Sequence, residues 1–246
     1  MKKLLIPVLG VGLLSFSMLS SAAVTLKTEQ DRLSYAIGAM TGKALKASKI
    51  DINEAAFNAG LLDSQSSKNL QMSEDEIKQT LQAFQQKQLE KSVAERKKMS
   101  DDNLKKGQAF LAQNANKPGV KTISVKLPNG NPTNLQYKVI KSGDGTGVSP
   151  TGNDEVAVNY EGRTIDGTVF DSSYRRGKPV TLALSQVIQG WQSGVAAMKP
   201  GDTWELYIPA ELAYGEKGAG SVIGPNETLI FKIELISVNK KVAQKK

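Results

Sequence analysis

The sequence contains no cysteine and no histidine, and only 6% of its 246 residues are aromatic. Without cysteine there can be no disulfide bond and no thiol nucleophile. The lack of both residue types excludes zinc sites built from them and proton transfer through imidazole. Stability must therefore come from packing. Any site is expected to work by excluding water and placing a few polar groups, and no cofactor or metal is expected.

The first 23 residues have the pattern of a secretory signal peptide. Lys2 and Lys3 precede an apolar run over 4–14, and small residues lead to a cleavage point near Ala22 or Ala23. The alternative is an N-terminal membrane anchor, although the apolar run is shorter than the ~20 residues that a spanning helix needs. We therefore expect 1–23 to be a signal peptide and the protein to be exported.

Basic residues outnumber acidic residues by 32 to 24, which gives a formal net charge of +8. Part of this excess lies in a basic tail, 239–246. A solvated tail accounts for it, and weak affinity for anionic surfaces is the alternative. No motif typical of nucleic-acid binding is present, so no nucleic-acid partner is expected.

Three helices are predicted before residue 118, and each begins at a capping-box pattern. The first begins near Thr28 with Asp31 three residues on, and the second begins at Asp51 with Glu54 three residues on. Apolar residues follow at helical spacing in the first of them: Leu33, Ile37, Met40 and Ala44.

The third predicted helix is unusually long. Its capping box is Ser73 with Glu76, no proline follows until Pro118, and the helix should end near Asn114. Some 42 helical residues would span about 60 Å. Its apolar residues are sparse and its middle is rich in Lys, Glu and Gln, which indicates a connecting helix, 73–117, surrounded by solvent. Gly107 is expected to be a weak point in it.

The segment 24–72 makes a poor core on its own. Two short helices with a stripe of Leu, Ile, Met and Gly are most simply buried against a copy of themselves, so we expect a homodimer through this N-terminal domain. The alternative is that the stripe packs within one chain on the C-terminal domain.

Short strands replace helices from residue 135. The strand patterns lie at 135–140, 155–160, 162–165, 203–208 and 228–236, with a hairpin turn at Asp166–Gly167 and one short helix within 184–198. This predicts an α+β fold, in which a C-terminal antiparallel sheet over 135–238 wraps on one short helix. It is preceded by the all-α N-terminal region, the connecting helix and a linker, 118–134.

Five short motifs in this C-terminal region resemble those of FKBP-type peptidyl-prolyl cis–trans isomerases, in the same order and spacing. They are NYEG at 159–162, GTVFDSS at 167–173, VIQGW at 187–191, AYG at 213–215 and PNETLIF at 225–231. The signal peptide, paired short helices and long helix are similar to those of the macrophage infectivity potentiator (Mip) subgroup. That resemblance implies a V-shaped dimer in the periplasm or at the surface of a Gram-negative bacterium, proline-containing polypeptides as substrates, and macrolides such as rapamycin as inhibitors.

The resemblance also implies a set of site residues. It assigns catalysis to Asp171, Tyr214, Phe170 and Trp191, and substrate or inhibitor binding to Tyr160, Arg176, Val187, Ile188, Ile223 and Phe231. Trp191 would form the floor beneath a substrate proline, Tyr214 would donate a hydrogen bond to a substrate carbonyl, and Arg176 would pair with Asp171 or Tyr160.

Several of these assignments have a plain structural alternative. Trp191, Ile188 and Phe231 could be ordinary core residues, and Asp171 could cap a turn at 172–173. The chain also departs from the family at Gly224, where many members have proline, and at Val180, where many have an aromatic.

The leading function is isomerisation of prolyl bonds in exported proteins through desolvation and orientation in an apolar pocket, without a covalent bond or a metal. Two alternatives remain at this point. One is a dimeric periplasmic chaperone, and the other is a surface virulence factor, with isomerase activity secondary in both.

Overall fold

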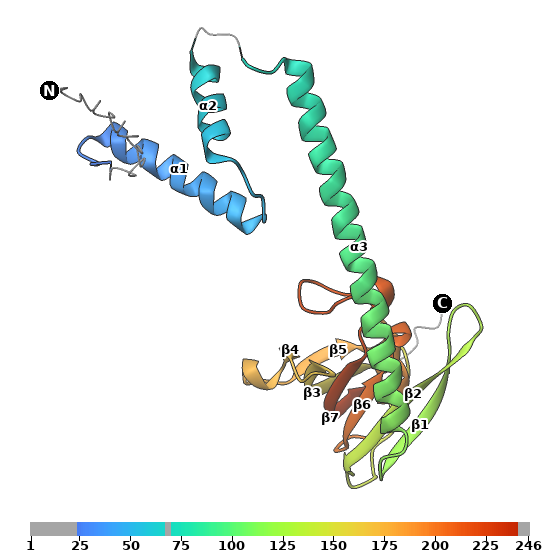
Figure 1. Ribbon diagram of the computed structural model, residues 1–246. Helices are drawn as coiled ribbons and strands as arrows, with labels where there is room; N and C mark the ends of the chain where they lie inside the picture. The colour runs from blue at the N-terminus through green and yellow to red at the C-terminus, as the bar shows by residue number, and fades with distance from the viewer. Residues whose placement is uncertain (1–23, 67–69, 241–246) are drawn as a thin grey trace, which may run out of the picture. The chain divides into compact units, whose positions relative to one another are not determined.

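The computed structural model describes residues 24–66 and 70–240 (Figure 1) and divides into two compact units, with the boundary in the sequence between Ile77 and Lys78. The expected signal peptide, 1–23, and most of the expected basic tail, 239–246, lie outside the described residues. Within the described ranges, no helix combines the length and apolar character needed to cross a membrane.

The first unit is built from two helices, α1 (Glu29–Ala47) and α2 (Glu54–Gln65). The capping box at α1 is confirmed, because the Asp31 N–H donates to Thr28 Oγ1 at 3.0 Å and the Thr28 N–H donates to Asp31 at 2.9 Å. The prediction that Asp51 caps α2 is wrong: Asn53 does so, accepting from the Ala56 N–H at 3.0 Å. Neither helix has a buried residue.

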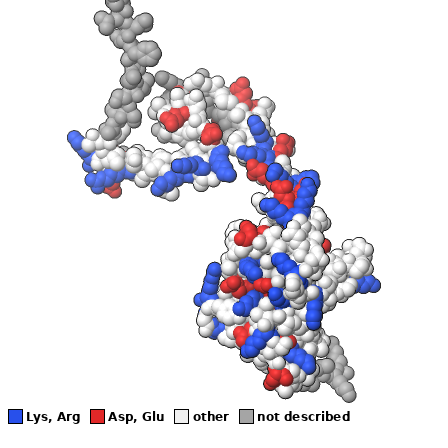
Figure 2. Space-filling view, turned by 60° about the horizontal axis from the view of Figure 1, so that its bottom comes forward, with Lys and Arg blue, Asp and Glu red and all other residues white. Residues whose placement is uncertain are grey.

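Helix α3 (Glu74–Asn114) confirms the predicted long helix. It begins at the Ser73 cap, whose N–H donates to Glu76 at 2.8 Å. Acidic and basic side chains are interspersed along it (Figure 2), including the ion pairs Lys97–Asp101 and Lys98–Asp102. This charged surface agrees with a helix surrounded by solvent over most of its length.

The C-terminal part of α3 instead lies on the sheet. Phe110 packs on Tyr207 of β6 with ring centroids 6.0 Å apart, and the buried Asn114 donates to Gln136 of β2 at 2.9 Å. Gly107 was expected to be a weak point, and α3 runs through it without a break. Gly107 is buried, and a Cβ there would overlap Oγ1 of Thr228, so glycine allows the helix to approach the loop before β7 closely.

The second unit is centred on a seven-stranded antiparallel sheet, which confirms the predicted α+β class. The path of neighbouring strands is β1-β2-β6-β7-β3-β4, and β5 pairs with the first half of β3. The strands are β1 (Val120–Lys126), β2 (Pro132–Lys141), β3 (Glu155–Thr164), β4 (Val169–Ser172), β5 (Val180–Ala183), β6 (Thr203–Ile208) and β7 (Leu229–Asn239).

Strand β1 occupies the segment expected to be a linker, 118–134. The segment alternates, and its apolar residues Ile123 and Val125 pack toward the core. This alternation was not recognised in the sequence, because lysines lie near both ends of the strand and the turn-forming run 127–131 follows it. Charged residues are typical of an edge strand, where they discourage pairing with another chain. Strand β5 was also missed, because four residues give too short a pattern.

The core lies between the sheet and α4 (Gln189–Val195), the predicted short helix. Strand β3 alternates buried and half-buried residues along its whole length, and it pairs with β7 over ten residues with one register shift. Because β3 and β7 lie at the centre of the sheet, side chains on their inner face meet α4 and line the site described next.

Candidate active site

A cavity of about 330 Å³ opens at one end of the core. Its wall comes from β3, β4, β5, the turn before α4, α4 itself, β7 and the loop between β6 and β7. The lining residues are Tyr160, Phe170, Asp171, Leu182, Gln186, Val187, Ile188, Trp191, Tyr214, Ile223 and Phe231. Its size and mostly apolar lining are typical of a small-molecule or peptide side-chain site.

Trp191 forms part of the cavity wall and is only 4% exposed. Tyr160 and Phe231 meet it edge to face, with centroids at 5.2 and 5.3 Å and interplanar angles of 87° and 89°. Phe170 meets Phe231 in the same way at 5.5 Å. Edge-to-face contacts of this kind stabilise ring positions beyond the area they bury, so the aromatic wall is fixed before any ligand arrives.

Gly162 makes this aromatic packing possible. A Cβ at this position of β3 would come within 2.6 Å of Phe231 and 2.7 Å of Phe170. Both distances are far below van der Waals contact, so any larger residue would push one of the rings out of the wall. The sequence gives a signal for this, since a glycine inside a strand often marks a close approach.

The short helix α4 sets the rim of the cavity. The Trp191 N–H donates to the Ile188 carbonyl at 2.9 Å, and the Gln192 side chain donates to the Val187 carbonyl at 2.8 Å. These bonds close the first turn of the helix, where no side chain caps the end. Val187 and Ile188 are therefore held in the cavity wall.

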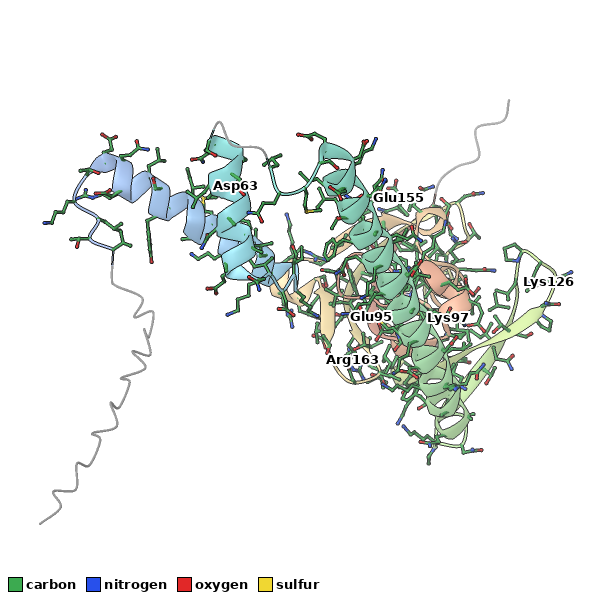
Figure 3. The ribbon with its side chains drawn as sticks, turned by 45° about the horizontal axis from the view of Figure 1, so that its top comes forward. Asp63, Glu95, Lys97, Lys126, Glu155 and Arg163 are labelled. Carbon is green, nitrogen blue, oxygen red and sulfur yellow. The ribbon has the colours of Figure 1, made fainter. Side chains whose placement is uncertain are left out.

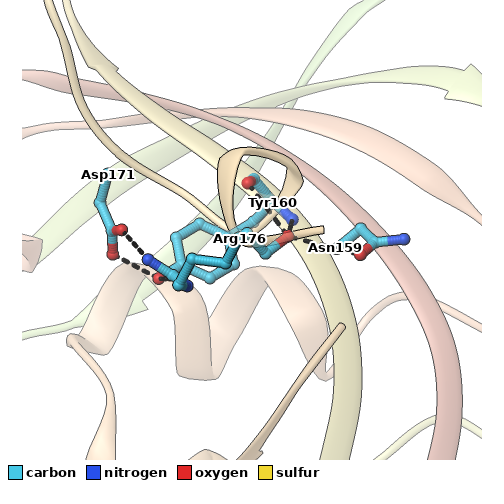
Figure 4. A network of polar contacts seen from close by, with 5 residues as sticks. Asn159, Tyr160, Asp171 and Arg176 are labelled. Atoms are coloured by element: carbon cyan, nitrogen blue, oxygen red, sulfur yellow. Dashed lines mark hydrogen bonds and ion pairs between the residues drawn. The ribbon is translucent and has the colours of Figure 1, made fainter. Parts of the chain in front are cut away.

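Three polar side chains form a closed ring at the edge of the cavity (Figure 4). The Tyr160 hydroxyl donates to one carboxylate oxygen of Asp171. Arg176 donates to the other oxygen at 2.6 Å and to the Tyr160 hydroxyl at 2.9 Å. Its guanidinium also lies over the Tyr160 ring, 5.6 Å from the centroid. Arg176 thus pairs with both residues that the family resemblance named.

This ring of polar side chains sets the charge states of Asp171 and Tyr160. Partial burial alone would raise the pKa of Asp171, but the hydrogen bonds from Tyr160 and Arg176 and the charge of Arg176 together hold that pKa below its usual value. Burial and the bond to Asp171 raise the pKa of Tyr160. Asp171 is therefore ionised and Tyr160 neutral near pH 7, so neither is poised to exchange a proton with a substrate.

Ser173 is a structural element of this site that the sequence analysis missed. Its buried hydroxyl accepts from the Tyr160 N–H at 2.8 Å, and its own N–H donates to the Tyr160 carbonyl at 2.9 Å. This pair of bonds ties β3 to the turn that carries Arg176. Ser173 thereby helps to place the turn from which Arg176 reaches Asp171.

Nine of the ten predicted site residues line the cavity, and the tenth, Arg176, completes its polar edge. Leu182 and Gln186 also line it and were not predicted, because they belong to the unrecognised strand β5 and the turn after it. Val180, which stands where many family members have an aromatic, does not line the cavity and packs against the core.

Comparison with known proteins agrees with this geometry. Residues 147–236 match the family model described as FKBP-type peptidyl-prolyl cis-trans isomerase, and residues 30–139 match that of the domain amino terminal to it. The peptidyl-prolyl cis-trans isomerase Mip of Coxiella burnetii is 54% identical over 98% of this chain and 100% of its own length. The outer membrane protein MIP of Legionella longbeachae is 46% identical, over 98% of both chains.

A solved structure supports the fold of both parts of the chain. The crystal structure of FkpA from Escherichia coli is 37% identical and covers 87% of this chain and 99% of its own, with a TM-score of 0.69. These matches favour the isomerase over the chaperone and virulence-factor alternatives. The chain therefore belongs to the family of FKBP-type peptidyl-prolyl cis–trans isomerases, in the Mip-like subgroup, and it catalyses the cis–trans isomerisation of prolyl peptide bonds.

Proposed function

We propose that the cavity around Trp191 is where the prolyl bond rotates, and that it works by desolvation and orientation. The observation that carries this proposal is the rigid aromatic wall beside a few polar groups. Resonance keeps an amide planar, and the planar form is more polar than the twisted transition state. An apolar cavity removes the hydration that favours planarity, so it binds the transition state better than the ground state.

The polar groups would orient the substrate without exchanging protons with it. Tyr214 lines the cavity and is 40% exposed, so its hydroxyl can reach a substrate carbonyl. The fixed charges of Asp171 and Arg176 hold Tyr160 against Trp191.

An uncatalysed prolyl bond isomerises in tens to hundreds of seconds. A ~10⁵-fold acceleration needs about 7 kcal/mol, which desolvation, the Tyr214 bond and orientation would share.

A peptide assay with two variants tests the assignment of the site. Isomerisation of an Ala-Pro peptide would be followed by NMR exchange spectroscopy for the wild type, Trp191→Ala and Trp204→Phe. Trp204 is the other tryptophan and stacks on Tyr137 away from the cavity lining. We expect Trp191→Ala to lose most activity while Trp204→Phe keeps it, and we expect rapamycin to inhibit the active proteins. Full activity in a folded Trp191→Ala protein would refute the assignment.

We also infer that the protein is a homodimer through residues 24–72. Large apolar side chains of α1 and α2 are exposed in the single chain, among them Leu33 at 54%, Ile37 at 59% and Met40 at 73%. Such a stripe is unusual for an isolated soluble unit and would be buried by a second copy. Light scattering should give twice the chain mass, and Ile37→Glu with Met40→Glu should give a monomer. A monomeric wild type would contradict this inference.

For localisation, we propose export to the periplasm or the outer membrane, directed by residues 1–23. The relative from Legionella longbeachae is named an outer membrane protein, and the pattern of Lys2, Lys3 and the apolar run supports export of this chain as well. Fractionation of cells that express the full chain should place it outside the cytoplasm, with an N-terminus near residue 24. A full-length cytoplasmic protein would contradict the proposal.

A further inference from the structure

The loop between β6 and β7 carries two residues of the cavity wall. The part of this loop from 213 to 228 is called the pocket loop here, and it contains Tyr214 and Ile223. Most of its internal order comes from short-range contacts. A bridge joins Ala219 to Ile223, and the Asn226 N–H donates to the Gly215 carbonyl at 2.8 Å. Side chains of α3 add hydrogen bonds from outside the loop.

Helix α3 lies against the pocket loop (Figure 1, orange-red loop beside green helix). Arg96 donates from one guanidinium nitrogen to the Glu216 carbonyl at 3.0 Å and to the Lys217 carbonyl at 2.8 Å. Asn103 donates to the Pro225 carbonyl at 2.9 Å. The two side chains thus hold the loop near both of its ends.

A third bond lies between these two. The Asn226 side chain donates to Ser100 Oγ at 2.8 Å. Arg96, Ser100 and Asn103 are spaced four and three residues apart, so they share one face of the helix. Gly107, which admits Thr228 closely, is four residues further along the same face. One continuous stripe of α3, 96–107, therefore contacts the pocket loop from residue 216 to residue 228.

The fit between helix and loop is close. A Cβ on Gly224 would come within 2.9 Å of the Asn103 amide and 3.4 Å of Met99 Sδ. The glycine at this position, where many family members have proline, therefore lets the loop lie directly on the helix. Pro225, the residue whose carbonyl Asn103 binds, is buried.

We propose that Arg96, Ser100 and Asn103 are positioning residues for the isomerase site. The carbonyls that Arg96 binds are two and three residues beyond Tyr214, and the carbonyl that Asn103 binds is two residues beyond Ile223. Holding these carbonyls fixes where Tyr214 and Ile223 stand on the cavity wall. The connecting helix therefore contributes to substrate recognition as well as connecting the two units. This inference rests on the proposed assignment of the cavity.

The test compares Arg96→Ala with Lys97→Ala in the full chain. Lys97 is adjacent on the same helix (Figure 3), its side chain is 75% exposed, and it pairs with Asp101 rather than with the pocket loop. KM and kcat would be measured for Ala-X-Pro-Phe peptides in which X varies.

For Arg96→Ala we expect KM to rise about three- to tenfold. A rise of this size corresponds to the cost of immobilising one or two flexible side chains when the substrate binds. The value of kcat should fall by a smaller factor than KM rises, because Arg96 acts only through the loop and the Tyr214 bond is only one of three contributions to transition-state stabilisation. The ratio of kcat/KM between the best and the poorest X residue should become smaller. Lys97→Ala should match the wild type, and Arg96→Lys, which keeps one cation near the two carbonyls, should restore part of the affinity.

Asn103→Asp is a second variant, independent of Arg96. It keeps the shape of the side chain but replaces the donating amide with a carboxylate that repels the Pro225 carbonyl, so KM should rise here too. A thermal melt checks that both variants fold. This second variant keeps the inference testable if Arg96→Ala proves too unstable.

Tyr214→Phe separates this inference from the assignment of the cavity. If Tyr214→Phe raises KM while folded Arg96→Ala and Asn103→Asp do not, the positioning role is refuted and the cavity assignment stands. If none of the three variants changes KM, Tyr214 does not bind substrate and the positioning role is refuted, whereas the cavity assignment is decided separately by Trp191→Ala. A rise in KM for all three, with Lys97→Ala unchanged, supports both.

Discussion

Replacing Asp171 with asparagine keeps the size of the side chain and removes its charge. In the wild type the carboxylate accepts from both Tyr160 and Arg176, and Tyr160 in turn meets Trp191 edge to face at 5.2 Å. The two donors bind different oxygens of the carboxylate, and in asparagine one of these oxygens is replaced by a donating NH₂ group, so one of the two donors loses its acceptor. Tyr160 is then less firmly held, and the aromatic wall loses part of its order.

The size of this effect follows from the exposure of the group. Hydrogen bonds to charged groups contribute about 1.5–3 kcal/mol when they are protected from solvent, whereas exposed ion pairs contribute about 0–1 kcal/mol. The Asp171 side chain is 41% exposed. We therefore take about 1 kcal/mol for its effect on Tyr160, which corresponds to a loss of about fivefold in kcat/KM. The melting temperature should fall by less than about 4 °C.

The assay is NMR exchange spectroscopy on an Ala-Pro peptide, which needs no coupling protease. Asp166→Asn is the matched control, since Asp166 is also a carboxylate that accepts from neighbours, Thr164 and Thr168, in the turn before β4. It does not line the cavity, so its kcat/KM should stay within about twofold of the wild type. Unchanged kcat/KM in Asp171→Asn would show that the polar ring has no part in catalysis and would refute this reasoning.

Two further predictions concern pH and packing. The lowered pKa of Asp171 means that its contribution to stability and activity is present above the unfolded pKa, about 3.9, and is lost as the pH falls through the folded value. Activity measured by NMR exchange should therefore be flat from pH 5 to about 8 and fall only in acid; a bell-shaped profile centred near pH 6.5 would contradict this. Gly107→Ala should gain about 0.5–1 kcal/mol of helix propensity but lose about 1–3 kcal/mol through overlap with Thr228. Urea unfolding should show net destabilisation that Thr228→Ala partly relieves, whereas additive effects would show that the two residues do not meet.

The regular elements were predictable because their local signals agree with their tertiary contacts. The capping boxes at Thr28 and Ser73 locate the starts of α1 and α3, and the Asp166–Gly167 turn joins β3 to β4. Strand β1 was missed because it is an edge strand, where half of the residues face solvent. The role of Gly107 was missed because a glycine that weakens a helix and a glycine that admits a neighbour look alike in a sequence.

The residues of the site likewise divide into those that the sequence could predict and those that it could not. The motifs that resemble the family identified Tyr160, Phe170 and Trp191. Each of these residues lies on a regular element, and the register of that element fixes the direction of the side chain. Ser173 and Arg96 could not be found in this way. Ser173 acts through a backbone pairing across thirteen residues, and Arg96 reaches carbonyls about 120 residues away. Contacts over such separations depend on the folded geometry, and one sequence holds no local sign of them.

The central claim, that the prolyl group binds against Trp191, can be tested by fluorescence. In a Trp204→Phe background Trp191 is the only remaining indole, since the chain has two tryptophans. We predict that rapamycin or an Ala-Pro peptide changes its emission saturably, with the same dissociation constant that inhibition or competition of isomerase activity gives. Full inhibition of the isomerase with no change in Trp191 emission would contradict the account.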